Sequence, residues 1–165
     1  MRMLQLALLA AAAAPISAVW GAAPPQHDWN TYGNARFELL ICFPADLLTP
    51  QPEADNGDGR VFVAADGTRL EVWGTFNAQN LTPAQVLAAE TAHITGEHGT
   101  ITYKASKPGW YALSGTMDGK VFYQRGLSDT VRFASFRLVY PKAAAATWNP
   151  VAARISECLK GAEGT

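Results

Sequence analysis

The sequence predicts an α+β fold in which a mainly antiparallel sheet of about six to seven strands is flanked by helices. Three observations favour this class. Several short segments alternate apolar and polar residues, as half-buried strands do. Asp-Gly or Pro-Gly pairs join neighbouring segments, which is typical of hairpins and therefore of antiparallel pairing. Two further segments, one after Leu81 and one after Asn149, carry helix start signals.

The first 21 residues have the pattern of a cleaved export signal. Arg2 precedes an apolar run of 11 residues, Leu4 to Ala14, and small residues follow at Ala18 and Gly21. A run of this length is too short to cross a bilayer of roughly 30 Å as a helix; an uncleaved anchor is the alternative. We therefore expect a periplasmic or secreted protein without a stable membrane span after cleavage, with a Pro-rich leader at 22–35, one domain at 36–160 and a flexible tail at 161–165.

The first half of the domain is expected to hold three strands. The first runs from Phe37 to Phe43 and stops at Pro44; a polar loop follows, and then a hairpin whose strands, at 60–65 and 69–77, flank a turn at Asp66-Gly67. Four side chains should share one face of the last of these strands: Arg69, Glu71, Trp73 and Thr75.

The next element should be a helix that begins at Thr82 and fades before Gly96. Thr82 has the character of an N-cap, Pro83 of a first helical residue, and Gln85 completes a capping box. A four-strand meander is then expected at 101–107, 110–117, 120–128 and 131–140, with turns at Pro108-Gly109 and Asp118-Gly119. Both faces of the last strand are largely apolar, which predicts that the sheet is covered on both sides there.

The two cysteines, Cys42 and Cys158, are expected to form a disulfide. Cys158 belongs to a terminal helix for which Asn149 is the predicted cap and Pro150 the first residue. Both sulfur atoms should point toward apolar layers, and export would place them in an oxidising compartment. Two separate buried thiols are the alternative. The spacing contains no CxxC motif, so thiol catalysis is not expected.

The order of these segments resembles the PsbP-like α/β/α sandwich superfamily. The resemblance rests on "YGNARFELLICFPADLL", "NGDGRVFVAADGTRLEVWG", "KPGWYALSG", "GKVFYQR" and "YP" followed by "WNPVAARI", and it covers about Trp29 to Leu159. These motifs are structural rather than catalytic. Because known members mostly bind proteins or stabilise assemblies, the resemblance implies a non-enzymatic role of that kind.

The acidic loop in "EADNGDG", Glu53 to Gly59, suggests a calcium site at first sight. An EF-type loop requires oxygen-bearing side chains at alternating positions, and Gly57 falls where one is needed. A looser site would use Asp55, Asn56 and Asp58. We favour the interpretation that Asn56-Gly57 and Asp58-Gly59 form turns, with their polar groups in solvent.

The sequence contains no recognisable catalytic or cofactor motif. Ser114 lacks the preceding glycine of a nucleophile elbow, and neither a phosphate-binding loop nor a dinucleotide fingerprint occurs. We therefore predict no cofactor and no enzymatic activity. A hydrolase with widely separated acidic residues remains an alternative hypothesis, as does a small-ligand or calcium carrier that uses the loop at 53–58.

The remaining candidates for function are surface residues. Trp73, Trp110, Arg69 and Arg125 are the predicted binding surface, because tryptophan and arginine often anchor interfaces. Residues 28–98 hold three basic and ten acidic residues, whereas residues 99–142 hold seven basic and two acidic ones. The net charge of −1 argues against nucleic-acid binding. The leading hypothesis is an exported accessory domain that binds a protein or a cell-envelope component.

Overall fold

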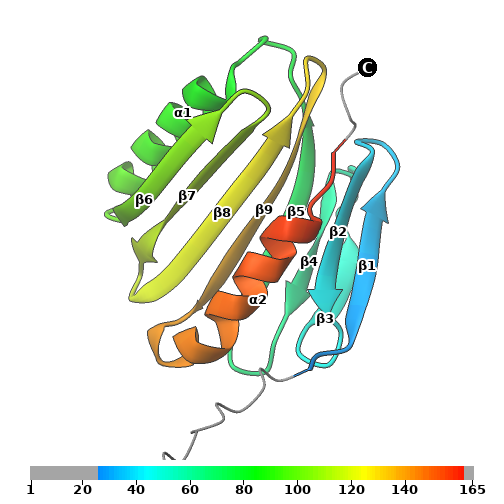
Figure 1. Cartoon of the computed structure of the whole chain (residues 1–165), viewed down its shortest axis with the longest axis vertical. Coiled ribbons are helices and arrows are strands. Elements are labelled where there is room, and N and C mark those ends of the chain that lie inside the picture. The colour runs from blue at the N-terminus through cyan, green and yellow to red at the C-terminus, as the bar shows by residue number, and fades with distance from the viewer. Residues whose placement is uncertain (1–25, 162–165) are drawn as a thin grey trace, which may run out of the picture.

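The structure is a computed structural model that describes residues 26–161, and these residues form two sheets and two α-helices (Figure 1). The predicted export signal and residues 162–165 of the predicted tail lie outside this range. The elements are β1 (Trp29–Asn34), β2 (Leu39–Pro44), β3 (Thr49–Glu53), β4 (Gly59–Val63), β5 (Arg69–Phe76), α1 (Pro83–Gly96), β6 (Thr100–Lys107), β7 (Trp110–Met117), β8 (Lys120–Ser128), β9 (Arg132–Pro141), a 3₁₀ turn (Lys142–Ala144) and α2 (Ala145–Cys158).

The main sheet has seven strands in the order β3-β4-β5-β9-β8-β7-β6, and every neighbouring pair is antiparallel. The predicted fold class is confirmed. The turns predicted at Asp66-Gly67, Pro108-Gly109 and Asp118-Gly119 each connect two paired strands. At Asp118-Gly119 both residues have positive φ, 50° and 74°, which is the geometry of a type I′ hairpin turn.

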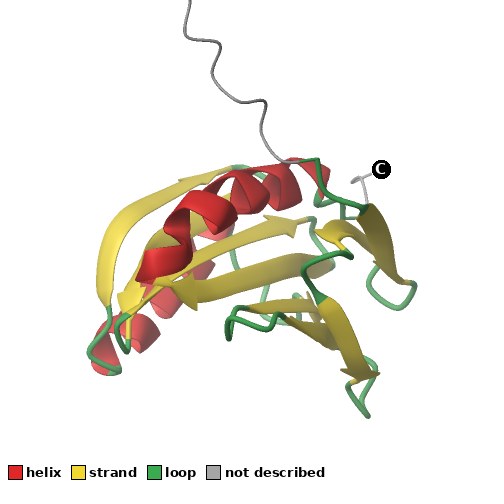
Figure 2. Ribbon diagram, turned by 90° about the horizontal axis from the view of Figure 1, so that it is seen from below, coloured by secondary structure: helices red, strands yellow, loops and turns green. Residues whose placement is uncertain are grey.

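One face of the main sheet is covered by α2 and by the hairpin of β1 and β2, which lie side by side (Figures 1 and 2). We call this side the α2 face. Its core is the larger hydrophobic cluster of the protein, in which the hairpin contributes Ile41, α2 contributes Ile155 and the central strand β9 contributes Phe136, each fully buried. This cluster fixes the positions of both N- and C-terminal elements on one layer.

The opposite face carries α1, which packs on β6, β7 and β8, and we call it the α1 face. A second cluster fills this interface, with Ile94 of α1 against Leu113 and Phe122 of the sheet. The helix begins as predicted: Thr82 is the N-cap, Pro83 follows, and Gln85 completes the capping box. Strand β9 has buried side chains on both faces, so the prediction of a sheet covered on two sides is confirmed.

Two strands were missed by the sequence analysis. Strand β1 lies within residues 22–35, which had been assigned to a Pro-rich leader, so the folded domain begins earlier than predicted. Its Asn and Gly residues have low strand propensity, and pairing with β2 together with burial of Tyr32 stabilises it instead. Strand β3 lies in the predicted polar loop and contains Pro50 and Pro52, which an edge strand tolerates.

Those two strands change the composition of the main sheet. The strand predicted at 37–43 is β2, which pairs with β1 in a separate two-stranded sheet. Strand β3 occupies the remaining place in the seven-stranded sheet, next to β4.

The start of the terminal helix also differs from the prediction. Helix α2 begins at Ala145, so Pro150 lies inside it and Asn149 does not cap it. The alanines at 143–146 have the highest helix propensity and extend the helix upstream. Trp148 fixes this first turn, because its ring is buried in the core and its Nε1 donates to Asp66 Oδ2 at 2.8 Å. Asn149 instead accepts a hydrogen bond of 2.6 Å from the Tyr140 hydroxyl.

The predicted disulfide between Cys42 and Cys158 is present, with the two Cα atoms 5.8 Å apart. It joins β2 to the last residue of α2, within one layer. Immediately beyond the helix, Lys160 forms two backbone hydrogen bonds with Leu40, of 2.8 and 3.0 Å. The chain after α2 therefore continues the edge of the small sheet.

Candidate functional site

The two covering layers leave opposite parts of the main sheet open. On the α2 face the hairpin and α2 pack over β3, β4, β5, β9 and β8, so β7 and β6 extend beyond them (Figure 1). On the α1 face the helix packs over β6, β7 and β8, so β4 and β5 extend beyond it. The exposed side chains of these strands are the candidates for binding.

Trp110 and Arg125 meet on the open part of the α2 face. Trp110 is the first residue of β7, and Arg125 lies on β8 opposite Ala112. The guanidinium carbon of Arg125 lies 5.2 Å from the centre of the Trp110 ring, a cation–π distance. Arg125 Nη1 also donates to the Ser156 hydroxyl of α2 at 2.9 Å. The arginine thus connects the half-buried tryptophan to the side of the helix.

Arg125 and Ser156 line a groove between α2 and the strands β7 and β8, which we call the Arg125 groove. Its volume is about 560 Å³, and its lining includes Ser114, Tyr123, Arg125, Tyr140, Ser156 and Glu157. The Tyr123 and Ser156 hydroxyls lie 3.2 Å apart. Burial raises the pKa of the Tyr140 hydroxyl above its ordinary value, so this group stays protonated and donates to Asn149.

The charge of Arg125 is not neutralised by any ion pair within residues 26–161. Its Nε atom is buried and has no hydrogen-bond partner among those residues. A partly buried guanidinium without an ion pair favours a carboxylate or another anionic group, because a charge-assisted hydrogen bond compensates its charge. The lining of the groove thus contains one such guanidinium, Arg125, and one carboxylate, Glu157.

Trp73 and Arg69 lie on the other face of the sheet, away from Trp110 and Arg125. Both belong to β5 and point to the α1 face, where Arg69 Nε pairs with Glu71 at 2.6 Å. Trp73 borders two hollows there, of about 300 and 350 Å³. The four residues predicted as one binding surface therefore form two separate pairs. Their faces depend on which strands are neighbours, and strand order is not visible in the alternation of a single segment.

A chain of buried polar side chains lies near Trp73, and the sequence analysis did not predict it. Arg137 bonds Glu90 at 3.0 Å and Gln124 at 2.7 Å, and Gln124 donates to the Tyr111 hydroxyl at 3.2 Å. The chain ends at Ser135, whose hydroxyl lies 3.3 Å from that of Tyr111. These contacts connect α1 to three strands, which is a structural role. The signal in the sequence was the presence of polar residues within strands that are otherwise apolar.

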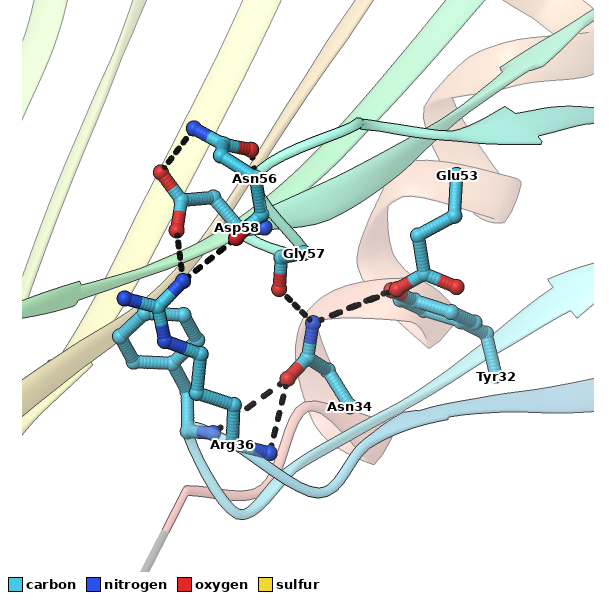
Figure 3. A network of polar contacts seen from close by, with 8 residues as sticks. Tyr32, Asn34, Arg36, Glu53, Asn56, Gly57 and Asp58 are labelled. Carbon is cyan, nitrogen blue, oxygen red and sulfur yellow. Dashed lines mark hydrogen bonds and ion pairs between the residues drawn. The ribbon is translucent and has the colours of Figure 1, made fainter.

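The acidic loop at 53–58 holds the β1–β2 hairpin in place, as Figure 3 shows. Arg36, in the hairpin turn, pairs with Asp58 at 2.9 Å, and Asn56 Nδ2 donates to the same carboxylate at 2.6 Å. Asp55 is exposed. Within residues 26–161 no group of three or more His, Cys, Asp and Glu side chains is arranged to hold a metal ion. The turn interpretation accounts for the loop without a bound ion.

A second contact in Figure 3 binds the strands themselves. The Tyr32 hydroxyl of β1 donates to Glu53 Oε1 of β3 at 2.6 Å, and Asn34 Nδ2 donates to the Gly57 carbonyl at 2.9 Å. Burial raises the pKa of Tyr32 to about 12, and the hydrogen bond to the Glu53 carboxylate acts in the same direction. These polar contacts join the hairpin to β3 and to the loop at Gly57, in addition to the apolar packing beneath the hairpin.

Comparison with known proteins finds one kind of match. No family model matches the chain, and no curated protein matches it by sequence. Its structure is similar to the solution structure of cyanobacterial PsbP (CyanoP) from Synechocystis sp. PCC 6803, with a TM-score of 0.61 over 86% of this chain and 98% of that one. The chain has a PsbP-like fold. The two sequences are only 10% identical, so the similarity between this protein and CyanoP concerns the fold alone.

The PsbP-like domain contains no helix, among the residues described, that is long and apolar enough to span a membrane. Its disulfide is of the kind that persists in oxidising compartments. The disulfide is compatible with an exported protein.

Proposed function

We propose that this protein is an exported, non-enzymatic accessory domain that binds a protein or cell-envelope component through the Arg125 groove. The observation that carries the proposal is the half-buried pair of Trp110 and Arg125, which lies beside a groove of about 560 Å³. Tryptophan and arginine are the residue types most enriched among interface residues that contribute strongly to affinity.

The environment of the pair supports binding of an acidic group. On the α2 face the charged side chains of strands β6 to β8 are Lys107 and Arg125, both positive, whereas Lys104 and Lys120 point to the α1 face. A positive surface accelerates encounter with a negative partner and sets its orientation. The guanidinium of Arg125, which lines the groove and has no ion pair among residues 26–161, then provides a specific contact.

The positions of the groups with shifted pKa values support a non-enzymatic role. The tyrosines and aspartates whose pKa values are shifted, Tyr32, Tyr111, Tyr140, Asp46 and Asp66, are explained by burial or by hydrogen bonds within the fold. Perturbed groups of a catalytic site would instead converge on a common cleft. The export signal that the sequence predicts and the disulfide support a periplasmic or secreted location.

A capture experiment with matched variants tests this function. The tagged protein is incubated with a cell-envelope extract, and bound proteins are quantified by mass spectrometry for the wild type, Trp110→Ala and Arg125→Ala. The controls are Trp73→Ala and Arg69→Ala, which remove the same residue types from the opposite face. Circular dichroism establishes that every variant is folded.

We expect an enriched partner whose affinity falls at least about tenfold in Trp110→Ala and in Arg125→Ala, the effect of losing a strongly contributing interface residue. The controls should retain the partner. Equal losses on both faces, equal retention by all variants, or no enriched partner would each contradict the proposal.

A further inference from the structure

Strand β6 forms an edge of the main sheet, and one side of its backbone has no partner strand among residues 26–161. It is the last strand in the sheet order and pairs only with β7. It runs for eight residues, Thr100–Lys107, and most of its side chains are exposed. Helix α1 packs on the α1 face of β6, β7 and β8, and in Figure 1 it lies behind β6.

The pairing with β7 shows which backbone groups point outward. The turn at Pro108-Gly109 has two residues, so the flanking pair Lys107 and Trp110 is the hydrogen-bonded kind. Pairs of the two kinds alternate along an antiparallel ladder. The N–H and C=O groups of Ser106 and Lys104 therefore point away from β7, toward the open edge.

The other edge of the sheet is closed to further pairing. Strand β3 contains Pro50 and Pro52, which lack the N–H group that a neighbouring strand would need. Strand β6 contains no proline. The prolines of β3 thus prevent a further strand from pairing at that edge, whereas β6 retains the backbone N–H groups that such a strand would need.

We propose that β6 accepts an extended, acidic segment of a partner protein, which adds to the sheet as an eighth strand. Main-chain hydrogen bonds supply affinity in such complexes and alternate side chains supply specificity. Lys107 and Tyr103 lie on the α2 face, because their cross-strand partners Trp110 and Ser114 do; Lys104 lies on the α1 face. Glutamate or aspartate side chains of an added strand would meet a lysine on either face.

Charge disfavours a second copy of this chain in the same place. Two β6 strands placed edge to edge would bring Lys104 and Lys107 of both copies together, and like charges on neighbouring strands are destabilising. This inference rests on the proposed function, because the partner that adds a strand to β6 would be the same partner that contacts the Arg125 groove.

Hydrogen exchange and one backbone substitution test the proposal. The purified protein is titrated with a short, blocked peptide of alternating glutamate and threonine, and amide exchange is followed by NMR. The amides of Lys104 and Ser106 should gain at least about tenfold protection, whereas those of Ala105 and Lys107, which already face β7, should not change. The same peptide with lysine in place of glutamate is the charge control.

Ser106→Pro removes one outward N–H and leaves the pairing with β7 intact, because proline is tolerated on the open side of an edge strand. It should abolish the protection, whereas Ser106→Ala, which retains the N–H, should preserve it. Absence of protection at millimolar peptide, protection elsewhere, equal binding of the lysine peptide or an undiminished effect in Ser106→Pro would overturn the proposal. If the protein self-associates and Ser106→Pro abolishes the self-association, the strand that pairs with β6 belongs to a second copy of this chain, and the proposal of an acidic partner is refuted.

Capture of the envelope partner by variants distinguishes a failure of this inference from a failure of the proposed function. A partner lost in Trp110→Ala but retained in Ser106→Pro would leave the Arg125 groove as the binding site and refute strand addition. A partner retained in both variants would refute both.

Discussion

Removing the disulfide should be the most destabilising single covalent change available in this fold. The perturbation is the double variant Cys42→Ala/Cys158→Ala. The bridge joins residues separated by 116 positions, and for a closed loop of this length the chain-entropy relation gives about 4.8 kcal/mol at 25 °C. For a domain of this size that corresponds to a decrease in melting temperature of about 15–20 °C.

The double variant should still fold, because other contacts hold the same elements together. Ile155 of α2 remains buried, and Lys160 still pairs with Leu40 through two backbone hydrogen bonds. The stabilisation from the bridge arises mainly in the unfolded chain, which expands when the bridge is removed. The denaturant dependence of the unfolding free energy, the m-value, should therefore increase in the variant.

Urea unfolding followed by circular dichroism measures both quantities. Wild-type protein treated with a reducing agent is the matched control and should give the same curve as the double variant. A loss of less than about 1 kcal/mol, or an unchanged m-value, would refute the reasoning, because it would mean that the unfolded chain is restrained without the bridge.

Three further predictions concern packing and pH. Gly74→Ala should destabilise by at least about 2 kcal/mol in thermal unfolding, because the added Cβ would lie 2.1 Å from the buried Phe37 ring, whereas Gly96→Ala, with open space around it, should not destabilise. Burial acts to raise the pKa of Asp66, but hydrogen bonds from Trp148 and Thr68 outweigh this effect, so the pKa is lowered in the folded state. The stabilisation from these hydrogen bonds is therefore fully present above the pKa of Asp66 in the unfolded chain, and it is lost as the pH falls through the pKa of Asp66 in the folded protein. Acid unfolding should show this loss in the wild type and less of it in Trp148→Phe, with Asp66→Asn as the second variant. The pKa of Tyr32 is about 12 in the folded state and about 10 in the unfolded state, so its stabilisation is complete below pH 10 and declines between pH 10 and 12. Urea unfolding across that interval should show a shallower decline in Tyr32→Phe; an equal slope would contradict the assignment.

Much of the fold follows from local sequence signals. The capping box at Thr82, the two-residue turn at Asp118-Gly119 and the turn at Asp66-Gly67 each require particular residue types at fixed spacing, so they are readable without knowledge of the partner elements. At Asp66-Gly67 the loop has three residues rather than the expected two, because Ala64 and Thr68 are hydrogen-bonded across it and only Gly67 has positive φ. Strands β1 and β3 lack such signals. Their stability comes from contacts distant in sequence, such as that of Tyr32 with Glu53, and local propensity does not reveal these.

The candidate site was only partly predictable for a related reason. Alternation along one strand indicates which side chains share a face, and it places Trp73 with Arg69. It does not show that β9 separates β5 from β8, or that α2 covers one face and α1 the other. The meeting of Trp110 with Arg125 follows from the register of β7 and β8, which only the assembled sheet defines.

The position of the disulfide makes most of this molecule a covalent ring. All seven strands of the main sheet and both helices lie between Cys42 and Cys158 along the chain. A protease that cuts one peptide bond between those cysteines, for example in the exposed turn around Asp55, therefore releases no fragment. The two pieces stay joined through sulfur and separate on a gel only after reduction.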